Sequence, residues 1–332
     1  MAVRSGGERE GGEFGLIARH LAPLAGEGAL GLRDDVGLVG GLAVTKDLLV
    51  PGTHFLASDP LDTVARKAVR VNASDLIAKG CAPRAMLLGL VWSYPPGDAA
   101  YQALATGLRA DLGTFGLTLL GGDTTRGDVG VNLFHEPVPL LSVTMLGSPL
   151  GKAIVPRGGA SPGDRLLVSG TIGDAGLGLR TLTGRYRPAP AHREALIAAY
   201  RIPEPPLAAA PLIAAHATAA LDVSDGLLAD AGHLARASGV RAVIRAEAVP
   251  LSDAGRAYVA SGGGVARLAT AGDDYQPLVA VPPGRADAFA QAARAAGVPF
   301  TQIGVCEAGE GVRLLGQDGT DLTPETLGFE HF

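Results

Sequence analysis

The stretch Leu117-Thr-Leu-Leu-Gly-Gly-Asp-Thr-Thr125 joins a short apolar run to two glycines, an acid and two hydroxyl residues. Such a run predicts a strand, with the polar residues exposed where the strand ends. Gly121 and Gly122 would let the backbone pass close to a bulky anion. Asp123 would offer a hard oxygen ligand to the magnesium ion that such an anion brings. Alone, the pattern is more typical of an ordinary turn, so a functional interpretation depends on the rest of the chain.

Acids stand at or near the ends of apolar runs at five further places. These are Arg33-Asp34-Asp35, Thr45-Lys46-Asp47, Asn72-Ala73-Ser74-Asp75, Asp222-Val223-Ser224-Asp225-Gly226 and Gly272-Asp273-Asp274-Tyr275. Six such clusters favour one site assembled from distant segments over six independent turns. Two phosphate groups of charge near −2 held about 4 Å apart would repel by on the order of 15 kcal/mol at an effective dielectric near 20. Carboxylates and hydroxyls that hold Mg²⁺ can cancel that charge, so the clusters predict a magnesium site for phosphoryl transfer.

Composition narrows the class of protein. The 332 residues suggest about two domains, and 47% hydrophobic residues are enough for proper cores. A formal net charge of −5 without any basic block argues against a nucleic-acid partner. Cys81 and Cys306 are too far apart to suggest a disulfide framework or a zinc site. The start of the chain lacks the apolar core of a signal peptide, and no apolar run reaches about 18 residues, so we expect a cytoplasmic protein without a membrane partner.

The order of patterns along the chain predicts its organisation. A glycine-rich tail covers residues 1–12, and a helical apolar period follows from Glu13 to Leu24. Strand and helix patterns then alternate as far as a glycine- and proline-rich stretch at 147–163. We therefore expect a tail at 1–12, an N-terminal domain at 13–148 and a C-terminal domain at 149–332, in a two-domain protein of the α/β or α+β class.

Several familiar nucleotide and nucleophile motifs fail on inspection. Gly147-Ser-Pro-Leu-Gly-Lys152 is one residue too short for a P-loop, and Ala153 follows where a hydroxyl is needed. The glycines from Gly170 to Gly178 do not have dinucleotide-loop spacing, although a phosphate-facing turn there stays open beside a plain helix start. No G-x-S-x-G elbow is present, which weighs against acyl transfer.

Taken together in order, the motifs resemble those of the thiamine-monophosphate kinase family. They are Gly12-Glu-Phe-Gly-Leu-Ile17, Asp34-Asp35, Thr45-Lys-Asp47, Gly52-Thr-His54-Phe55, Asn72-Ala-Ser-Asp75, Gly121-Gly-Asp123-Thr, Arg157-Gly-Gly-Ala160, Ser169-Gly-Thr-Ile-Gly-Asp174, Asp222-Val-Ser-Asp225-Gly, Gly272-Asp-Asp274-Tyr and Phe329-Glu-His-Phe332. The resemblance implies direct in-line transfer from ATP to thiamine monophosphate, which forms thiamine diphosphate in the last step of its biosynthesis. It also implies the fold of aminoimidazole ribonucleotide synthetase: an N-terminal α/β domain whose mixed sheet forms a homodimer, and a C-terminal α+β domain.

The resemblance also assigns roles to positions of this chain. Mg²⁺ ligands would be Asp35, Thr45, Asp47, Asp75, Asp123, Asp222 and Asp225. ATP would contact Gly122, Asp123, Arg157 and Ser224, whereas thiamine monophosphate would contact His54, Asp273, Asp274 and Phe329. Catalysis would rest on Asp47, Asp123 and Asp225 through alignment and charge neutralisation, without a general base.

The chain departs from the family pattern at a few positions. Lys46 stands where a second hydroxyl is usual, which would remove one magnesium ligand and place an ammonium near phosphate. Arg33 and Ala271 replace usual glycines, Pro277 replaces a usual leucine, and residues 127–138 resemble an insertion. These departures leave the number of bound ions and the shape of the substrate pocket open.

Alternatives remain within and outside this chemistry. One is another ATP-using synthetase of the same superfamily, of the selenophosphate or aminoimidazole ribonucleotide type. The first normally carries a reactive cysteine near its N-terminus, and none precedes Cys81. A hydrogenase-maturation protein would need a C-terminal cysteine, but this chain ends in Glu330-His331-Phe332. A catalytically inactive nucleotide-binding regulator is the third alternative, against which the retained acids argue.

Overall fold

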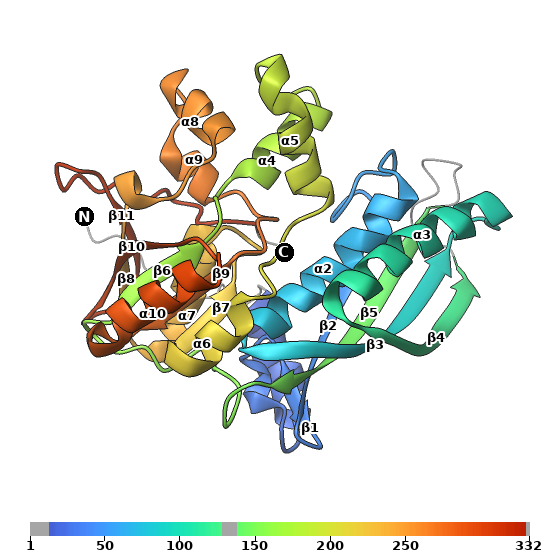
Figure 1. Ribbon diagram of the computed structural model, residues 1–332, viewed down its shortest axis with the longest axis horizontal. Helices are drawn as coiled ribbons and strands as arrows, with labels where there is room; N and C mark the ends of the chain where they lie inside the picture. Colours follow the sequence, from blue (N-terminus) through green and yellow to red (C-terminus); the bar gives the residue numbers. More distant parts are fainter. Residues whose placement is uncertain (1–12, 128–137, 330–332) are drawn as a thin grey trace.

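The computed structural model describes residues 13–127 and 138–329. Its first half is built on a five-stranded sheet of order β1-β2-β5-β3-β4. The strands are β1 (Gly37–Val39), β2 (Leu42–Leu49), β3 (Cys81–Trp92), β4 (Thr118–Arg126) and β5 (Pro139–Pro149). Strands β3 and β4 are parallel, and the other pairs are antiparallel. Two long helices, α2 (Leu61–Ala78) and α3 (Asp98–Phe115), cover one face (Figure 1).

Alternation of side chains explains which face these helices cover. In β5, Leu141, Val143 and Met145 are fully buried, while the residues between them are partly exposed. A strand with this period of two places its apolar side chains on one face of the sheet. Helix α3 ends at Gly116, whose φ of +63° is the left-handed conformation that glycine adopts without strain at a helix end. The next residues then enter β4 at the edge of the sheet.

The second half is built on a six-stranded sheet of order β11-β8-β10-β6-β9-β7. The strands are β6 (Arg165–Ser169), β7 (Ala219–Asp222), β8 (Arg241–Arg245), β9 (Pro277–Val281), β10 (Phe300–Glu307) and β11 (Gly311–Leu315). Leu167 and Val279 on one face belong to the core that also holds α2, α6 (Ala209–His216) and α10 (Pro283–Ala295). Leu166 and Leu278 face the other way, onto α7 (Leu227–Ser238). Helix α2 therefore packs against both halves.

Four helices form a small lobe beyond the second sheet (Figure 1). They are α4 (Asp174–Leu182), α5 (Pro190–Arg201), α8 (Asp253–Ala260) and α9 (Val265–Ala269), with a core of Leu177, Leu196, Ala254 and Leu268. Helix α5 lies within a proline-rich part of the chain. Pro190 occupies the first turn of that helix, where its missing N–H costs nothing.

The short elements near the N-terminus are less regular than expected. The single helix predicted for 13–24 is divided into α1 (Glu13–Leu16), a π-helical turn η1 (Ile17–Leu21) and a 3₁₀ turn η2 (Ala22–Leu24). Two further 3₁₀ turns are η3 (Leu30–Leu32) and η4 (Ala246–Ala248).

The two-domain α/β and α+β architecture is confirmed. The boundary after residue 148 remains a prediction, and it falls one residue before β5 ends. The predicted tail at 1–12 lies outside the described residues, as does most of the predicted insertion. No helix in the described ranges is long and apolar enough to cross a membrane.

Candidate active site

Polar side chains of α2 organise the space between the two domains. Asn72 accepts a hydrogen bond from the backbone N–H of Asp47 (3.2 Å) and donates one to the carbonyl of Ala68 (2.9 Å). Ser74 donates to the carbonyl of Tyr275 in the second domain (3.2 Å). The polar side of α2 therefore fixes strand β2 and the second domain relative to each other.

Acids from distant segments meet beside this helix. A cavity of about 900 Å³ is lined by Asp47 of β2, Asp75 of α2, Asp222 of β7 and the turn residues Ser224 and Asp225. Thr45 lies on the same side of β2 as Asp47, and its hydroxyl donates to the Asp75 carboxylate. The structure thus brings together most of the predicted magnesium ligands from four segments of the chain.

Burial makes this acid cluster electrostatically costly. Burial and the nearby Asp35 carboxylate together raise the pKa of Asp222 to about 7. Burial, again with Asp35, raises the pKa of Asp47 to about 6. Burial and three neighbouring carboxylates raise the pKa of Asp75 well above its usual value. Each carboxylate therefore takes up protons readily unless a cation replaces them.

Asp35 differs because the protein supplies its counter-charges. Burial alone would raise its pKa, but Lys79 and Arg157 overcome that effect and lower the pKa to about 2. The Lys79 ammonium lies 2.5 Å from Asp35 and 2.8 Å from Asp34, and it donates to the carbonyl of Ala220 (2.6 Å). The Arg157 guanidinium pairs with Asp35 as well. Sequence reasoning missed Lys79, which looked like an ordinary lysine at a helix end.

The remaining acids suit hard cations. No ion pair in the described part of the chain involves Asp47, Asp75 or Asp222, and their oxygens are the donors that Mg²⁺ prefers. The carboxylates of these three acids do not converge on a single ion position. Among the described residues, the one set of three ligand groups within 4.8 Å of one another is Asp225, Asp230 and His233. These carboxylates could therefore serve as ligands for Mg²⁺ that enters with a phosphate group.

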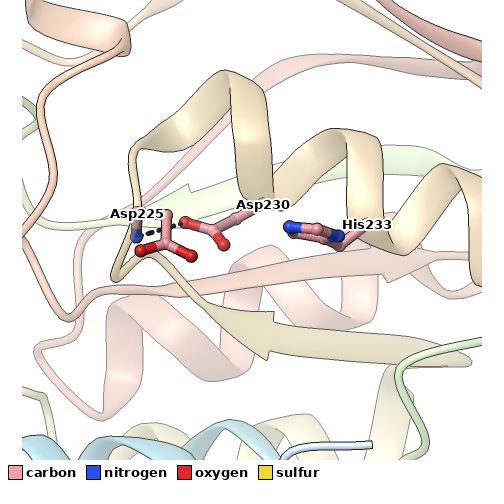
Figure 2. Close-up of side chains that lie close together, drawn as sticks. All are labelled: Asp225, Asp230 and His233. Atoms are coloured by element: carbon pink, nitrogen blue, oxygen red, sulfur yellow. Dashed lines mark hydrogen bonds between the residues drawn. The ribbon is translucent and has the colours of Figure 1, made fainter. Parts of the chain in front are cut away.

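Asp230 shapes the turn that presents Ser224 and Asp225 (Figure 2). One of its carboxylate oxygens accepts hydrogen bonds from the backbone N–H groups of Ser224, Asp225 and Gly226, at 3.0, 3.0 and 3.1 Å. His233 lies beyond it on α7, where burial, Arg157 and Arg236 lower its pKa to about 4. Sequence reasoning missed Asp230, although an acid in the first turn of a helix is a recognisable signal.

Two glycines allow this turn to pack against the loop at 270–274. Gly226 has φ +120°, and a Cβ there would come within 2.9 Å of the backbone of Thr270. A Cβ on Gly272 would lie 2.4 Å from the carbonyl oxygen of Ser224. Asp273 donates its backbone N–H to that same carbonyl (2.8 Å). Both glycines are therefore required by close backbone contact.

The predicted substrate residues divide into two groups. His54, Asp273 and Phe329 line the cavity. Asp273 is held by Lys67 at 3.1 Å, and the backbone N–H of Phe329 donates to the carbonyl of Asp225 (3.0 Å). Asp274 is buried and accepts from the backbone N–H of Gly173 (2.8 Å), so its carboxylate holds the loop to the start of α4. Contact of Asp274 with substrate remains a prediction.

Asp123 and Gly122 lie apart from the other acids. Asp47 is in register with Val143 of β5, then Leu88 of β3, then Gly122 of β4. Three strand spacings separate Asp47 from Gly122 by about 14 Å. Asp123 is one residue further and therefore points to the opposite face, which it shares with Lys46. The Lys46 ammonium donates to the Ser142 hydroxyl on that outer face. A single chain does not bring Asp123 to the acid cluster.

Comparisons with known proteins agree with this geometry. Residues 33–148 match the family described as AIR synthase related protein, N-terminal domain, and residues 161–317 match its C-terminal domain. A curated thiamine-monophosphate kinase of Caulobacter vibrioides is 43% identical, over 96% of this chain and 90% of its own. The chain belongs to the thiamine-monophosphate kinase family. The predicted resemblance is thus confirmed.

Further members of the thiamine-monophosphate kinase family support the assignment. The Escherichia coli K12 enzyme is 36% identical over 97% of this chain and 98% of its own. A solved structure described as AaThiL complexed with AMPPCP and TMP is 31% identical, has a TM-score of 0.82, and covers 100% of this chain and 99% of that one. The hydrogenase-maturation protein HypE of Escherichia coli is 21% identical with a TM-score of 0.66, so it shares the fold alone.

Proposed function

We propose that the protein transfers the terminal phosphate of ATP to the phosphate of thiamine monophosphate, giving thiamine diphosphate and ADP. The carrying observation is the 900 Å³ cavity, in which Asp47, Asp75 and Asp222 gather without an ion-pair partner among the described residues. Family members carry the name of this activity, and the solved AaThiL structure is described with an ATP analogue and TMP. Phosphoryl transfer needs alignment and charge neutralisation, and this cavity offers both.

Mg²⁺ is part of this proposal. Asp47, Asp75, Asp222 and Asp225 would hold the ions with Asp35 and Thr45, and the ions would neutralise the two phosphate groups as they approach. The chain's own residues prepare the site. Asn72 fixes Asp47, Lys79 and Arg157 keep Asp35 ionised, and Asp230 holds the turn that carries Ser224 and Asp225.

The acceptor would lie in the same cavity. Thiamine monophosphate joins an aromatic cation to a phosphate, and the cavity joins the aromatic ring of Phe329 to an acid cluster. Phe329 lines this cavity and is 51% exposed, and stacking on its ring would stabilise a bound aromatic ring. His54 and Asp273 line the same cavity, and Lys67 contacts both, through the His54 carbonyl and the Asp273 carboxylate. We expect the phosphate at the acids and the rings at Phe329.

A homodimer would supply the missing residues Gly122 and Asp123. All nine residues of β4 are exposed, and Leu48 and Leu87 are 48% and 42% exposed on the outer face of the sheet. An exposed edge strand beside an apolar face favours association with a second copy. In a two-fold dimer, each copy would offer its Asp123 to the other. We place this reaction in the cytoplasm, where ATP is available.

The decisive assay is incubation with ATP, MgCl₂ and thiamine monophosphate, followed by chromatographic detection of thiamine diphosphate and ADP in equal amounts. A matched sample with excess EDTA should form neither product. Selenide and formylglycinamidine ribonucleotide serve as alternative acceptors. ATP consumption with either of these, but not with thiamine monophosphate, would assign the chain to another synthetase of the superfamily.

A further inference from the structure

The 900 Å³ cavity carries opposite charges on its inner and outer parts. The acids belong to the inner part, where Asp75 is half-buried and Asp222 is 4% exposed. Three arginines of the small lobe line the same cavity: Arg180 in α4, Arg185 just after α4, and Arg267 in α9 (Figure 1). Arg185 and Arg267 are exposed, so they lie where the cavity meets solvent. A ligand that enters beside the lobe passes these cations before it reaches the acids.

None of the three arginines is neutralised by the described part of the chain. Their guanidinium groups take part in no ion pair there, whereas Arg193 of the same lobe pairs with Glu194 at 2.7 Å. Glu13 also lines the cavity, but no ion pair among the described residues joins it to them. The Nε of Arg180 is buried and has no hydrogen-bond partner. Such an orphaned donor is unusual in a folded protein, and an anionic ligand would supply its acceptor.

The net charge of a ligand decides how these arginines act on it. A phosphate monoester has a charge near −2 at pH 8, because its second pKa is about 6. Thiamine monophosphate also carries one thiazolium cation, so it is a net anion with a charge near −1. Thiamine without the phosphate keeps only the thiazolium and is a net cation with a charge of about +1. A cationic entrance attracts the first molecule and repels the second.

We propose that Arg180, Arg185 and Arg267 form an arginine rim that makes the cavity select phosphorylated thiamine over free thiamine. This inference rests on the proposed function and adds the residues that set the selectivity for the acceptor. The acid cluster alone would select poorly, because carboxylates attract a thiazolium cation whether or not a phosphate is attached to it. Free thiamine would then occupy the cavity without offering an acceptor phosphate. The rim opposes this, because it lowers the local concentration of cations and raises that of anions.

The double variant Arg185→Gln/Arg267→Gln tests the rim with little risk to the fold, because both side chains are exposed and form no ion pair in the described ranges. Calorimetry at pH 8 with MgCl₂ and AMPPCP measures the Kd values of thiamine monophosphate and of thiamine. The variant should bind thiamine monophosphate about threefold more weakly and thiamine about threefold more tightly, so the ratio of the two Kd values should change roughly tenfold. General damage to the site would weaken both ligands. Opposite shifts therefore identify an effect of charge.

The double variant Arg187→Gln/Arg193→Gln is the matched control. Arg187 and Arg193 are exposed in the same lobe, but neither is among the described residues that line the cavity. This control removes the same charge and should change the Kd ratio less than about twofold. Adding Arg180→Gln to the rim variant should shift the ratio further in the same direction. An unchanged ratio in the rim variant, equal weakening of both ligands, or an equal change in the control would each overturn the inference.

Salt supplies an independent measurement. Raising KCl from about 0.05 M to about 0.5 M should reduce the preference of the wild type for thiamine monophosphate severalfold, and that of the rim variant less. The same loss of preference in both proteins would contradict a role of the rim.

The two proposals can fail separately. Wild-type protein that makes thiamine diphosphate, with a Kd ratio that the rim variant leaves unchanged, would refute the arginine rim alone. Wild-type protein that makes no thiamine diphosphate, with opposite Kd shifts in the rim variant, would refute the proposed reaction alone.

Discussion

Replacing Asp222 by asparagine should stabilise the metal-free protein while removing its activity. Asp222 is 4% exposed at the end of β7, and its pKa rises from the usual 3.8 to about 7. A carboxyl whose folded pKa is raised contributes stability while it is protonated, and that stability is lost as pH rises through about 7. At pH 8 the ionised Asp222 carboxylate therefore lowers the free energy of unfolding by about 4 kcal/mol, because each pKa unit corresponds to 1.36 kcal/mol. This figure assigns the whole pKa rise to Asp222, although it is coupled to the neighbouring acids.

Asparagine has nearly the same shape and no charge, so it removes most of this cost. Allowing for coupling within the cluster, we expect a gain of about 2 kcal/mol or more, or roughly 4 °C in melting temperature. Calorimetric unfolding of the wild type and of Asp222→Asn in EDTA, at pH 8 and at pH 5, measures this gain. The gain should be larger at pH 8, because the wild-type carboxyl is protonated in the folded state at pH 5. Mg²⁺ should then raise the melting temperature of the wild type more than that of Asp222→Asn.

Asp111→Asn is the matched control. Asp111 is also buried, but it accepts hydrogen bonds from Arg70 at 2.6 and 3.0 Å and from Arg66 at 3.3 Å. Its removal leaves the Arg70 charge buried without a partner, which costs about 3 to 5 kcal/mol, so the melting temperature should fall. If Asp222→Asn also lowers the melting temperature at pH 8 in EDTA, the reasoning about an uncompensated acid cluster is refuted.

Four further outcomes can be measured. Asp225→Asn should lower turnover by orders of magnitude with the melting temperature preserved, and an unchanged rate would leave Asp225 a turn residue only. The Mg²⁺ concentration that gives the half-maximal rate should decrease as the pH is raised from 6 to 8, because the pKa values of Asp47 and Asp222 are about 6 and about 7. The same Mg²⁺ requirement at every pH would contradict their role as ligands. Phe329→Ala should raise the KM for thiamine monophosphate about threefold to tenfold through lost stacking, with the KM for ATP as its control. Asp47→Asn and Asp123→Asn should each be inactive. If Asp123 acts across a two-fold dimer, a mixture of equal amounts of the two variants should recover about a quarter of wild-type activity once their subunits have exchanged. No recovery would contradict that arrangement.

Much of the site could be predicted because its residues follow simple local patterns. An apolar run followed by Asp-Val-Ser-Asp-Gly predicts a strand, a turn and a helix, and α7 begins and ends at the predicted residues 227 and 238. The acids at 47, 75, 222 and 225 then line one cavity. Helix α2 also carries polar residues with specific contacts: Asn72 binds the backbone of Asp47, and Asp75 lines the cavity shared with the second domain.

Other features depend on information that local patterns lack. The alternation of side chains along a strand predicts that adjacent residues face opposite sides of the sheet. It does not predict which strands lie side by side, so the separation of Asp123 from Asp47 follows only from the order of the strands in the sheet. The lobe helix α5 was not predicted, since prolines stand on both sides of it and Pro190 begins it. Asp230 and Lys79 look like ordinary helix residues in the sequence, and their roles arise from the backbone groups and carboxylates that the fold brings to them.

The cations of α2 bear on how this architecture can be divided or recombined. Lys67 donates to the carbonyl of His54 and pairs with Asp273, Arg70 donates to the carbonyl of Pro203, and Lys79 donates to the carbonyl of Ala220. The contacts with Asp273, Pro203 and Ala220 join the first domain to the second through buried charges. A second domain that placed no acceptors there would leave these charges buried without partners, which is expensive in an apolar surrounding. Chimeras between relatives should therefore tolerate a junction near residue 150 only when the loops that receive these three side chains come from the same parent as α2.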